Sequence, residues 1–206
     1  HDQIFTPYGY EDSDIFNRWI LAGYEMIQSR DAFVYHLTCR GHRWNKGVGI
    51  VNDDYDSTMN RCRRDFIRKW GDWIRNDEFQ FPIINSKYNV GFVVKNCNLQ
   101  LLELLEPWCS TFYCDEQFTV GRVSDYVENE DTSFDLYERI KYDGDEKSND
   151  ILIEMDGTTL TQEDFGVIQQ LSEILKDSGE IGEFELGNLK ITINSLTEYQ
   201  NDLINC

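Results

Sequence analysis

The stretch from Val90 to Cys114 most constrains the fold, because a strand, a helix and a second strand follow one another there. Val90–Val94 is a short, continuously apolar run of the kind found in buried strands. Leu99–Leu105 is rich in leucine, as a packed helix is, and Pro107 stops it. Ser110–Cys114 returns to strand-like composition. Two strands joined through a helix predict a parallel pair with a right-handed crossover.

The residues after this unit predict further strands and one more helix. We expect strands over 134–142 and 150–155, and a helix over 161–176 that opens with a capping-box-like Thr-Gln-Glu-Asp. A closing hairpin is expected over 184–193, whereas 115–132 reads as polar and irregular. The unit order predicts a small α+β sandwich with its helices on one face.

The N-terminal part of the chain predicts two helices, over 13–28 and 54–76, and a strand over 31–38. The first helix is expected to end near Gly23 or shortly after. Residues 79–87, with a proline, read as a linker. The other face of the second helix is basic and has two interpretations, a solvated surface or a surface turned toward a nucleotide-sugar or an acidic neighbour. The basic side chains on that face are Arg61, Arg63, Arg64, Arg68 and Lys69.

Charge divides the chain unevenly. Residues 1–87 hold 12 basic and 13 acidic side chains, whereas residues 88–206 hold 7 basic and 25 acidic ones. This step predicts two domains, 1–87 and 88–206. The net charge of −19 argues against nucleic acid or an anionic membrane as a partner, because both would be repelled.

The six cysteines form no Cys-x-x-Cys motif and no structural zinc spacing. Several lie in apolar runs, as small reduced core residues do, and this favours the reducing cytosol. We therefore expect a cytoplasmic protein, with no membrane span and no signal peptide. Because residue 1 is His rather than Met, we expect a fragment or a processed product.

Three acids, Glu11, Asp12 and Asp14, lie within four positions and precede an apolar, helix-like run. Acidic side chains are favoured at a helix start, because the free N–H groups and the helix dipole attract negative charge. The simplest interpretation is an acidic first turn, with Asp12 or Ser13 as the cap residue.

The order of motifs around this cluster carries more information than the cluster itself. An acidic pair is followed by a helix with Arg18, a Gly23-Tyr24 turn and a β-rich run that ends in His36. Over residues 1–45 this order resembles the C-terminal half of the catalytic domain of inverting family 2 glycosyltransferases. The Glu-Asp-x-Asp run is similar to that of animal beta-galactosyltransferases. The resemblance implies the C-terminal part of a Rossmann-like nucleotide-sugar transferase domain, so that the whole chain is expected to be α/β or α+β.

The resemblance also implies roles for individual residues. Asp12 matches the catalytic base that takes the proton of the acceptor hydroxyl, and Glu11 matches an acid that binds the acceptor. Asp14 and Arg18 are expected near the substrate, as a helix-start acid and its partner. His36 matches a histidine near the metal or the diphosphate, and it is expected to face one cleft with Asp12. The implied cofactor is a divalent metal, Mn²⁺ or Mg²⁺.

The loop after His36 supplies further candidates. His42 is a second candidate metal ligand, because some relatives place the histidine further along the chain. Arg40 and Arg43 could contact a pyrophosphate, and Trp44 lies beside them as a candidate substrate contact. The alternatives are a strand-end histidine satisfied by the backbone and solvated loop charges.

The chain departs from the family pattern in one respect. Family members bind the nucleotide-sugar with an N-terminal Rossmann-like half that carries an Asp-x-Asp motif, and no such half precedes Glu11. Asp54-Tyr55-Asp56 has the letters but follows the acidic motif. The primary hypothesis is a glycosyltransferase fragment that is silent alone and acts with a nucleotide-sugar, a glycan acceptor and either a chain carrying the missing half or a second copy. The alternative is a non-catalytic binding or structural module.

Overall fold

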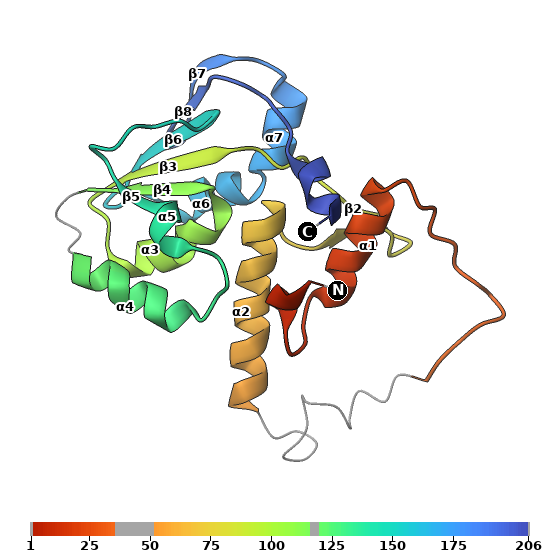
Figure 1. The fold of residues 1–206 in the computed structure, drawn as a ribbon. Coiled ribbons are helices and arrows are strands. Elements are labelled where there is room, and N and C mark those ends of the chain that lie inside the picture. The colour runs from red at the N-terminus through yellow and green to blue at the C-terminus, as the bar shows by residue number, and fades with distance from the viewer. Residues whose placement is uncertain (1, 36–51, 116–119, 206) are drawn as a thin grey trace.

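The computed structural model describes residues 2–35, 52–115 and 120–205. It has a mixed α/β fold built around a six-stranded mixed sheet of order β5-β4-β3-β6-β8-β7 (Figure 1). The first four strands in that order are parallel, and β8 and β7 run antiparallel to their neighbours. The strands are β3 (Val90–Lys95), β4 (Thr111–Cys114), β5 (Ile140–Tyr142), β6 (Ile151–Asp156), β7 (Gly182–Leu186) and β8 (Leu189–Ile193).

The predicted strand–helix–strand unit is present as β3, α3 (Leu99–Leu105) and β4, with the two strands parallel. The side chain of Asn98 caps α3 by accepting a hydrogen bond from the backbone N–H of Leu101. The predicted closing hairpin is present as the antiparallel pair β7 and β8. Both predictions are confirmed. The two units could be predicted because the signals for each are local in sequence.

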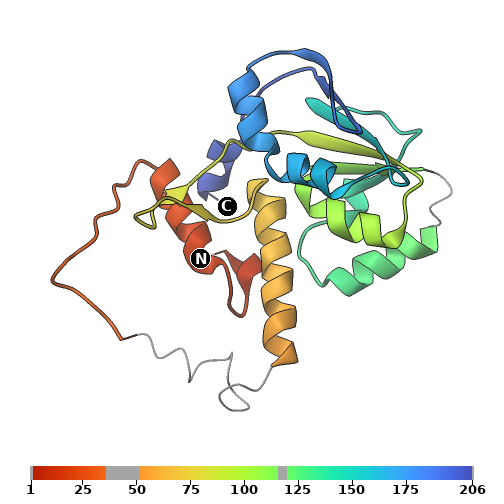
Figure 2. The ribbon, with the colours of Figure 1, turned by 180° about the vertical axis from the view of Figure 1, so that it is seen from behind.

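The helices that follow β3 cover one face of the sheet, and Figures 1 and 2 show α3, α4 and α6 together on that side. Phe92, Ile153 and Ile191 lie side by side on neighbouring strands and belong to one buried cluster with the helices. Burying this continuous apolar layer is the main stabilising contribution to the fold. The remaining helices of this part are α4 (Val120–Glu130), α5 (Leu136–Arg139), α6 (Gln162–Gln169) and α7 (Leu171–Ser178).

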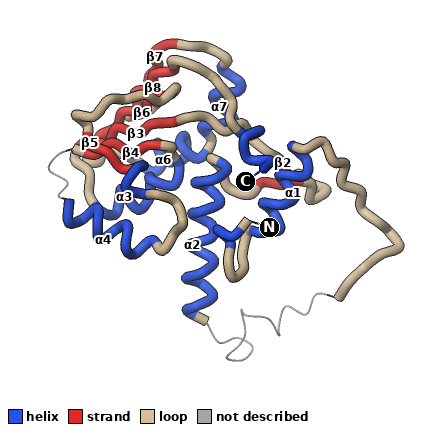
Figure 3. Tube along the Cα trace, viewed as in Figure 1, coloured by secondary structure: helices blue, strands red, loops and turns tan. Residues whose placement is uncertain are grey.

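A second, smaller cluster lies beside the sheet unit, where the two ends of the chain meet (Figure 3). Phe5, Phe66, Trp70 and Leu203 are buried in it. Its side chains come mainly from η1 (Gln3–Phe5), α1 (Glu11–Leu21), α2 (Asp53–Trp70) and η5 (Gln200–Asn205). The short antiparallel pair β1 (Arg75–Asn76) and β2 (Pro82–Ile83) follows α2. The 3-10 turn η4 (Glu106–Trp108) follows α3 and contacts α2.

Several predicted boundaries of the N-terminal part are wrong. The helix expected over 13–28 starts earlier, at Glu11, and ends at Leu21, close to the predicted stop near Gly23. The one expected over 54–76 ends at Trp70, where Gly71 takes the left-handed conformation. The described part of the strand expected over 31–38 is not a strand, since residues 31–35 are exposed and pair with no other strand. Strand propensity needs a neighbouring strand and a surface to cover, and neither is present there.

Three predictions for the C-terminal part also need correction. The region 115–132, expected to be irregular, contains α4, whose Val123 and Tyr126 are buried at helical spacing. The strand expected over 134–142 is the short helix α5 followed by β5. The helix expected over 161–176 is two helices, α6 and α7, which break at Gln170.

Side chains from each side of the expected boundary at residue 87 pack into the hydrophobic cluster of the other side. Ile67 of α2 belongs to the larger cluster, and Leu203 belongs to the smaller one. Lys87 donates hydrogen bonds to the carbonyls of Arg68 and Lys69 at the end of α2. No helix in the described part of the chain is both long and apolar enough to cross a membrane.

Candidate functional site

The acidic motif opens α1 at a tight turn. Gly9 and Tyr10 both have positive φ, 110° and 69°, and Tyr10, not Asp12 or Ser13, is the N-cap residue. The carboxylate of Glu11 turns back and accepts a hydrogen bond from the backbone N–H of Gly9. A Cβ on Gly9 would lie 2.8 Å from the sulfur of Met59 on α2, so this turn packs closely on that helix. The first turn of α1 is thereby held in place.

Asp14 is the acid of this motif that points inward, and it is 0% exposed. Its Oδ1 accepts a hydrogen bond from Trp70 Nε1 at 3.0 Å and lies 2.8 Å from Lys69 Nζ. Its Oδ2 lies 3.0 Å from Arg18 Nε, so the expected pair of Asp14 with Arg18 is present. Asp14, expected near substrate, instead joins α1 to the C-terminal end of α2, and both of its oxygens are occupied.

Asp12 lies on the same helical turn but has the opposite environment. It is exposed, and its carboxylate makes no hydrogen bond or ion pair with the residues that the structure describes. Acids at this position are stabilised by the free N–H groups of the first turn. The motif therefore presents one carboxylate, that of Asp12, which no described residue engages, on a helix end that Asp14 anchors.

The remaining predicted site residues belong to the segment 36–51. His36, Arg40, His42, Arg43 and Trp44 all lie outside the described residues. Among the residues that are described, no three His, Cys, Asp or Glu side chains gather in a group able to hold a metal ion. What the described part contributes is thus the Glu11–Asp12 carboxylates and their support.

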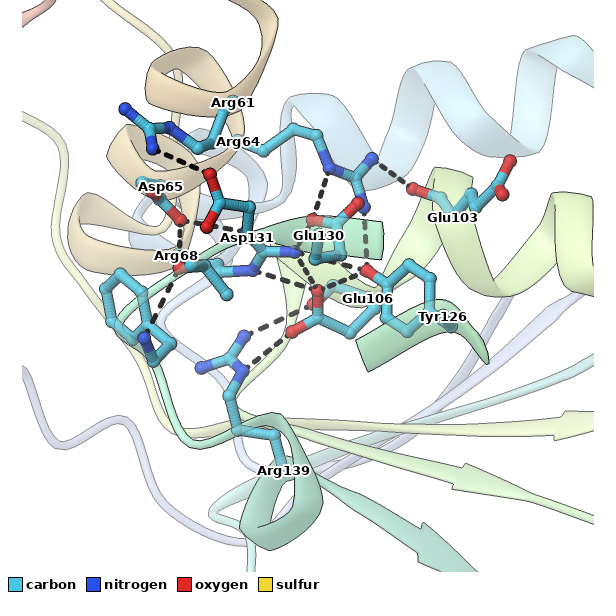
Figure 4. A network of polar contacts seen from close by, with 12 residues as sticks. Arg61, Arg64, Asp65, Arg68, Glu103, Glu106, Tyr126, Glu130, Asp131 and Arg139 are labelled. Carbon is cyan, nitrogen blue, oxygen red and sulfur yellow. Dashed lines mark hydrogen bonds and ion pairs between the residues drawn. The ribbon is translucent and has the colours of Figure 1, made fainter. Parts of the chain in front are cut away.

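A buried ionic network, which the sequence analysis did not predict, lies on the opposite side of α2 (Figure 4). Arg68 is at its centre, with Nη1 2.9 Å from Asp65 Oδ1 and Nη2 2.7 Å from Glu106 Oε2. Arg139 reaches the other oxygen of Glu106 at 2.7 Å. Tyr126 donates its hydroxyl to Glu106 Oε2 at 2.8 Å. The basic face of α2 thus meets an acidic neighbour, which is one of its two predicted interpretations.

Electrostatics in this network follow from burial and pairing. Burial alone would raise the pKa of Glu106, but the attraction of Arg139 and Arg68 outweighs it and lowers that pKa to about 2. Burial and the nearby Glu106 carboxylate raise the pKa of Tyr126 well above its usual value. Glu106 is therefore charged and Tyr126 neutral at ordinary pH, so the network fastens α2 to the sheet unit. No local sequence signal could have paired residues 38 positions apart.

Comparison of the chain with protein-family models, with curated proteins and with solved structures finds no match. The likeness of residues 1–45 to family 2 glycosyltransferases is therefore a likeness of motif order alone. The chemistry that the described residues offer depends on the contrast between Asp12, which is exposed, and Asp14, which is buried and paired.

Proposed function

We propose that this chain carries the acceptor side of an inverting glycosyltransferase site, with Asp12 as the general base. The observation that supports it is the exposed carboxylate of Asp12, which no described residue engages, on a helix start that buried Asp14 anchors. A base works well when it is fixed in position yet open to its substrate. Glu11, one residue earlier, would contact the acceptor sugar.

The proposed step conserves atoms and charge. The acceptor hydroxyl oxygen attacks the anomeric carbon of a nucleotide-sugar, and its proton passes to the Asp12 carboxylate. The bond from that carbon to the diphosphate oxygen breaks, and the nucleoside diphosphate leaves with the bonding electrons. A positioned base of this kind contributes about 10²–10⁴-fold to the rate.

The divalent ion implied by the resemblance, Mn²⁺ or Mg²⁺, would stabilise the leaving diphosphate. The described residues do not fit such an ion, since they form no group of three suitable ligands. The proposal therefore assigns only the proton transfer to this part of the chain. The nucleotide-sugar and a second chain or second copy remain proposed partners.

A second candidate, a non-catalytic interaction module, is favoured by the segment that follows α1. Figures 1 and 2 show this segment running away from the body of the protein. Five of its large apolar side chains are 68–91% exposed, and exposed apolar surface of this kind is typical of interaction sites. They are Tyr24, Ile27, Phe33, Val34 and Tyr35.

The test is an assay of the purified chain with a panel of nucleotide-sugars and acceptor glycans, with Mn²⁺ or Mg²⁺ present. Transfer with inversion that falls at least about a hundredfold in Asp12→Asn supports the base role. Asp54→Asn is the matched control, because Asp54 is an exposed acid in the first turn of the other long helix, α2. Transfer that survives in Asp12→Asn would overturn the assignment.

If the chain shows no transfer, binding of acceptor glycans is measured by amide NMR. Acceptor glycans that shift the resonances of Glu11 and Asp12, and bind more weakly to Asp12→Asn, support an acceptor-side site without turnover. Self-association that Phe33→Ser and Tyr35→Ser abolish, with no glycan binding, replaces the proposal with the interaction module. The absence of turnover, glycan binding and association refutes both candidates.

A further inference from the structure

An aromatic groove lies where α2, the turn η4 and α6 meet, on a different part of the molecule from Asp12. It encloses a cavity of about 200 Å³. Ligand sites for whole cofactors are usually larger, about 300–1,000 Å³. This groove therefore suits a single ring-sized group better than a nucleotide. The side chains that line it include Arg63, Trp73, Leu104, Trp108, Phe165 and Gln169.

Three aromatic rings form the wall of the groove. The Trp73 and Trp108 rings meet edge to face with centroids 5.8 Å apart, and Trp108 meets Phe165 in the same way at 6.0 Å. Trp73 is 41% exposed and Leu104 is 42% exposed, so part of this apolar wall faces solvent. Edge-to-face packing fixes the rings and leaves a rigid apolar surface.

Hydrogen-bond donors stand beside the rings. In the described part of the chain, no partner accepts from the indole N–H of Trp73 or Trp108, or pairs with the side-chain amide of Gln169. An indole can pack its ring against apolar atoms while its N–H binds a polar group. The groove thus combines apolar faces with donors, as the C–H faces and hydroxyl groups of a sugar ring require.

Arg63 supplies the charge. Arg61, Arg64 and Arg68 on the same helix each pair with an acid, whereas Arg63 is exposed and forms no ion pair or hydrogen bond with any described residue. A guanidinium with no partner among the described residues is notable in a chain with a net charge of −19. Guanidinium groups bind carboxylate and phosphate through paired N–H donors.

We propose that this groove binds one sugar ring that carries a carboxylate or a phosphate group. The ring would pack on Trp73 and Trp108, and its anionic group would bind Arg63. The proposal goes beyond the transfer reaction and does not depend on Asp12. It gives the chain a second carbohydrate-binding position, which would hold an acidic glycan.

The test is titration of the full chain, followed by amide NMR, with four probes: glucuronate, glucose 6-phosphate, glucose and inorganic phosphate. We expect the two anionic sugars to bind and to shift the indole resonances of Trp73 and Trp108. Glucose and phosphate should each bind at least about tenfold more weakly, because each offers only half of the contacts. A preference for glucuronate or for glucose 6-phosphate identifies which anionic group the site favours.

Two variants test the assignment of the residues. Arg63→Gln should weaken the anionic sugars about tenfold or more and leave glucose unchanged. Trp73→Ala should weaken all three sugars. Arg122→Gln and Phe79→Ala are the matched controls, since both side chains are exposed and lie outside the groove. Asp12→Asn should leave this binding intact. A failure of the groove proposal can therefore be told apart from a failure of the transfer proposal.

Three results would overturn the inference. The first is the absence of saturable binding of either anionic sugar below about 10 mM. The second is binding that neither Arg63→Gln nor Trp73→Ala weakens. The third is inorganic phosphate that binds as tightly as glucose 6-phosphate, because the aromatic wall would then contribute nothing.

Discussion

Nη2 of Arg68 lies 2.7 Å from Oε2 of Glu106, and both side chains are 0% exposed. The pair joins the last turn of α2, the longest described helix, to the turn η4 that follows α3. Charges taken out of water are costly unless they are paired and hydrogen-bonded. Here every oxygen of Glu106 has a charged partner, because Arg139 binds Oε1. Docking of α2 on the sheet unit therefore depends on this pair.

Glu106→Gln should lower the free energy of unfolding by about 3–5 kcal/mol. The change leaves Arg68 and Arg139 without their shared countercharge inside the protein. Urea unfolding followed by tryptophan fluorescence measures it. Asp131→Asn is the control, because the Arg61–Asp131 pair is formed with an acid that is 86% exposed and should contribute about 0–1 kcal/mol. Equal losses for the two variants would contradict the prediction.

Stability should fall as the pH is lowered from about 4.5 to about 2. Burial opposes the charged form of Glu106, but Arg139 and Arg68 lower its pKa to about 2 from the ordinary 4.5. A lowered carboxyl pKa means that the stabilisation is complete above the unfolded pKa and is lost as the pH falls toward the folded one. The loss should be about 3 kcal/mol. The free energy of unfolding, measured at several pH values across this range, should change less with pH for Glu106→Gln than for the natural chain.

Asp14→Asn and Asp12→Asn should separate structural support from chemistry. Asp14→Asn removes the buried countercharge of Lys69 and Arg18 and should cost about 3–5 kcal/mol. Asp12→Asn changes an exposed side chain and should alter stability by no more than about 0.5 kcal/mol. Thermal unfolding and amide exchange in α1 measure both effects. A large stability loss in Asp12→Asn would show that Asp12 is structural.

Gly187→Ala and Gly166→Ala should change stability in opposite directions. Gly187 has φ +62° in the β7–β8 turn, and a Cβ there would collide with the Asp164 carboxylate. Asp164 itself accepts a hydrogen bond from the backbone N–H of Asn188 at 2.9 Å. We expect Gly187→Ala to cost about 1–2 kcal/mol or more. Gly166 lies in α6 with open space around it, so Gly166→Ala should stabilise by about 1 kcal/mol, as thermal unfolding would show.

Several elements could be predicted from the sequence because their signals are local. The β3–α3–β4 unit follows from an apolar run, a leucine-rich helix and Pro107. The hairpin follows from Gly187-Asn188 between two strand-like runs, and the start of α6 follows from Thr161 and Asp164, which form a capping box. Helix α4 could also have been predicted, because Val123, Tyr126 and Val127 recur at helical spacing, although the residues between them are polar.

Other features could only be decided by the tertiary structure. The sequence places three acids at the start of α1, but only packing against Lys69 and Trp70 makes Asp14 a buried anchor and leaves Asp12 exposed. Residues 31–35 have strand-like composition and lie in no strand, since no neighbouring strand pairs with them. Capping, turns and short apolar runs act over a few residues, and the sequence by itself determined these. The pairing of Arg68 with Glu106 depends on which surfaces meet when distant segments pack together, and that only the folded chain decides.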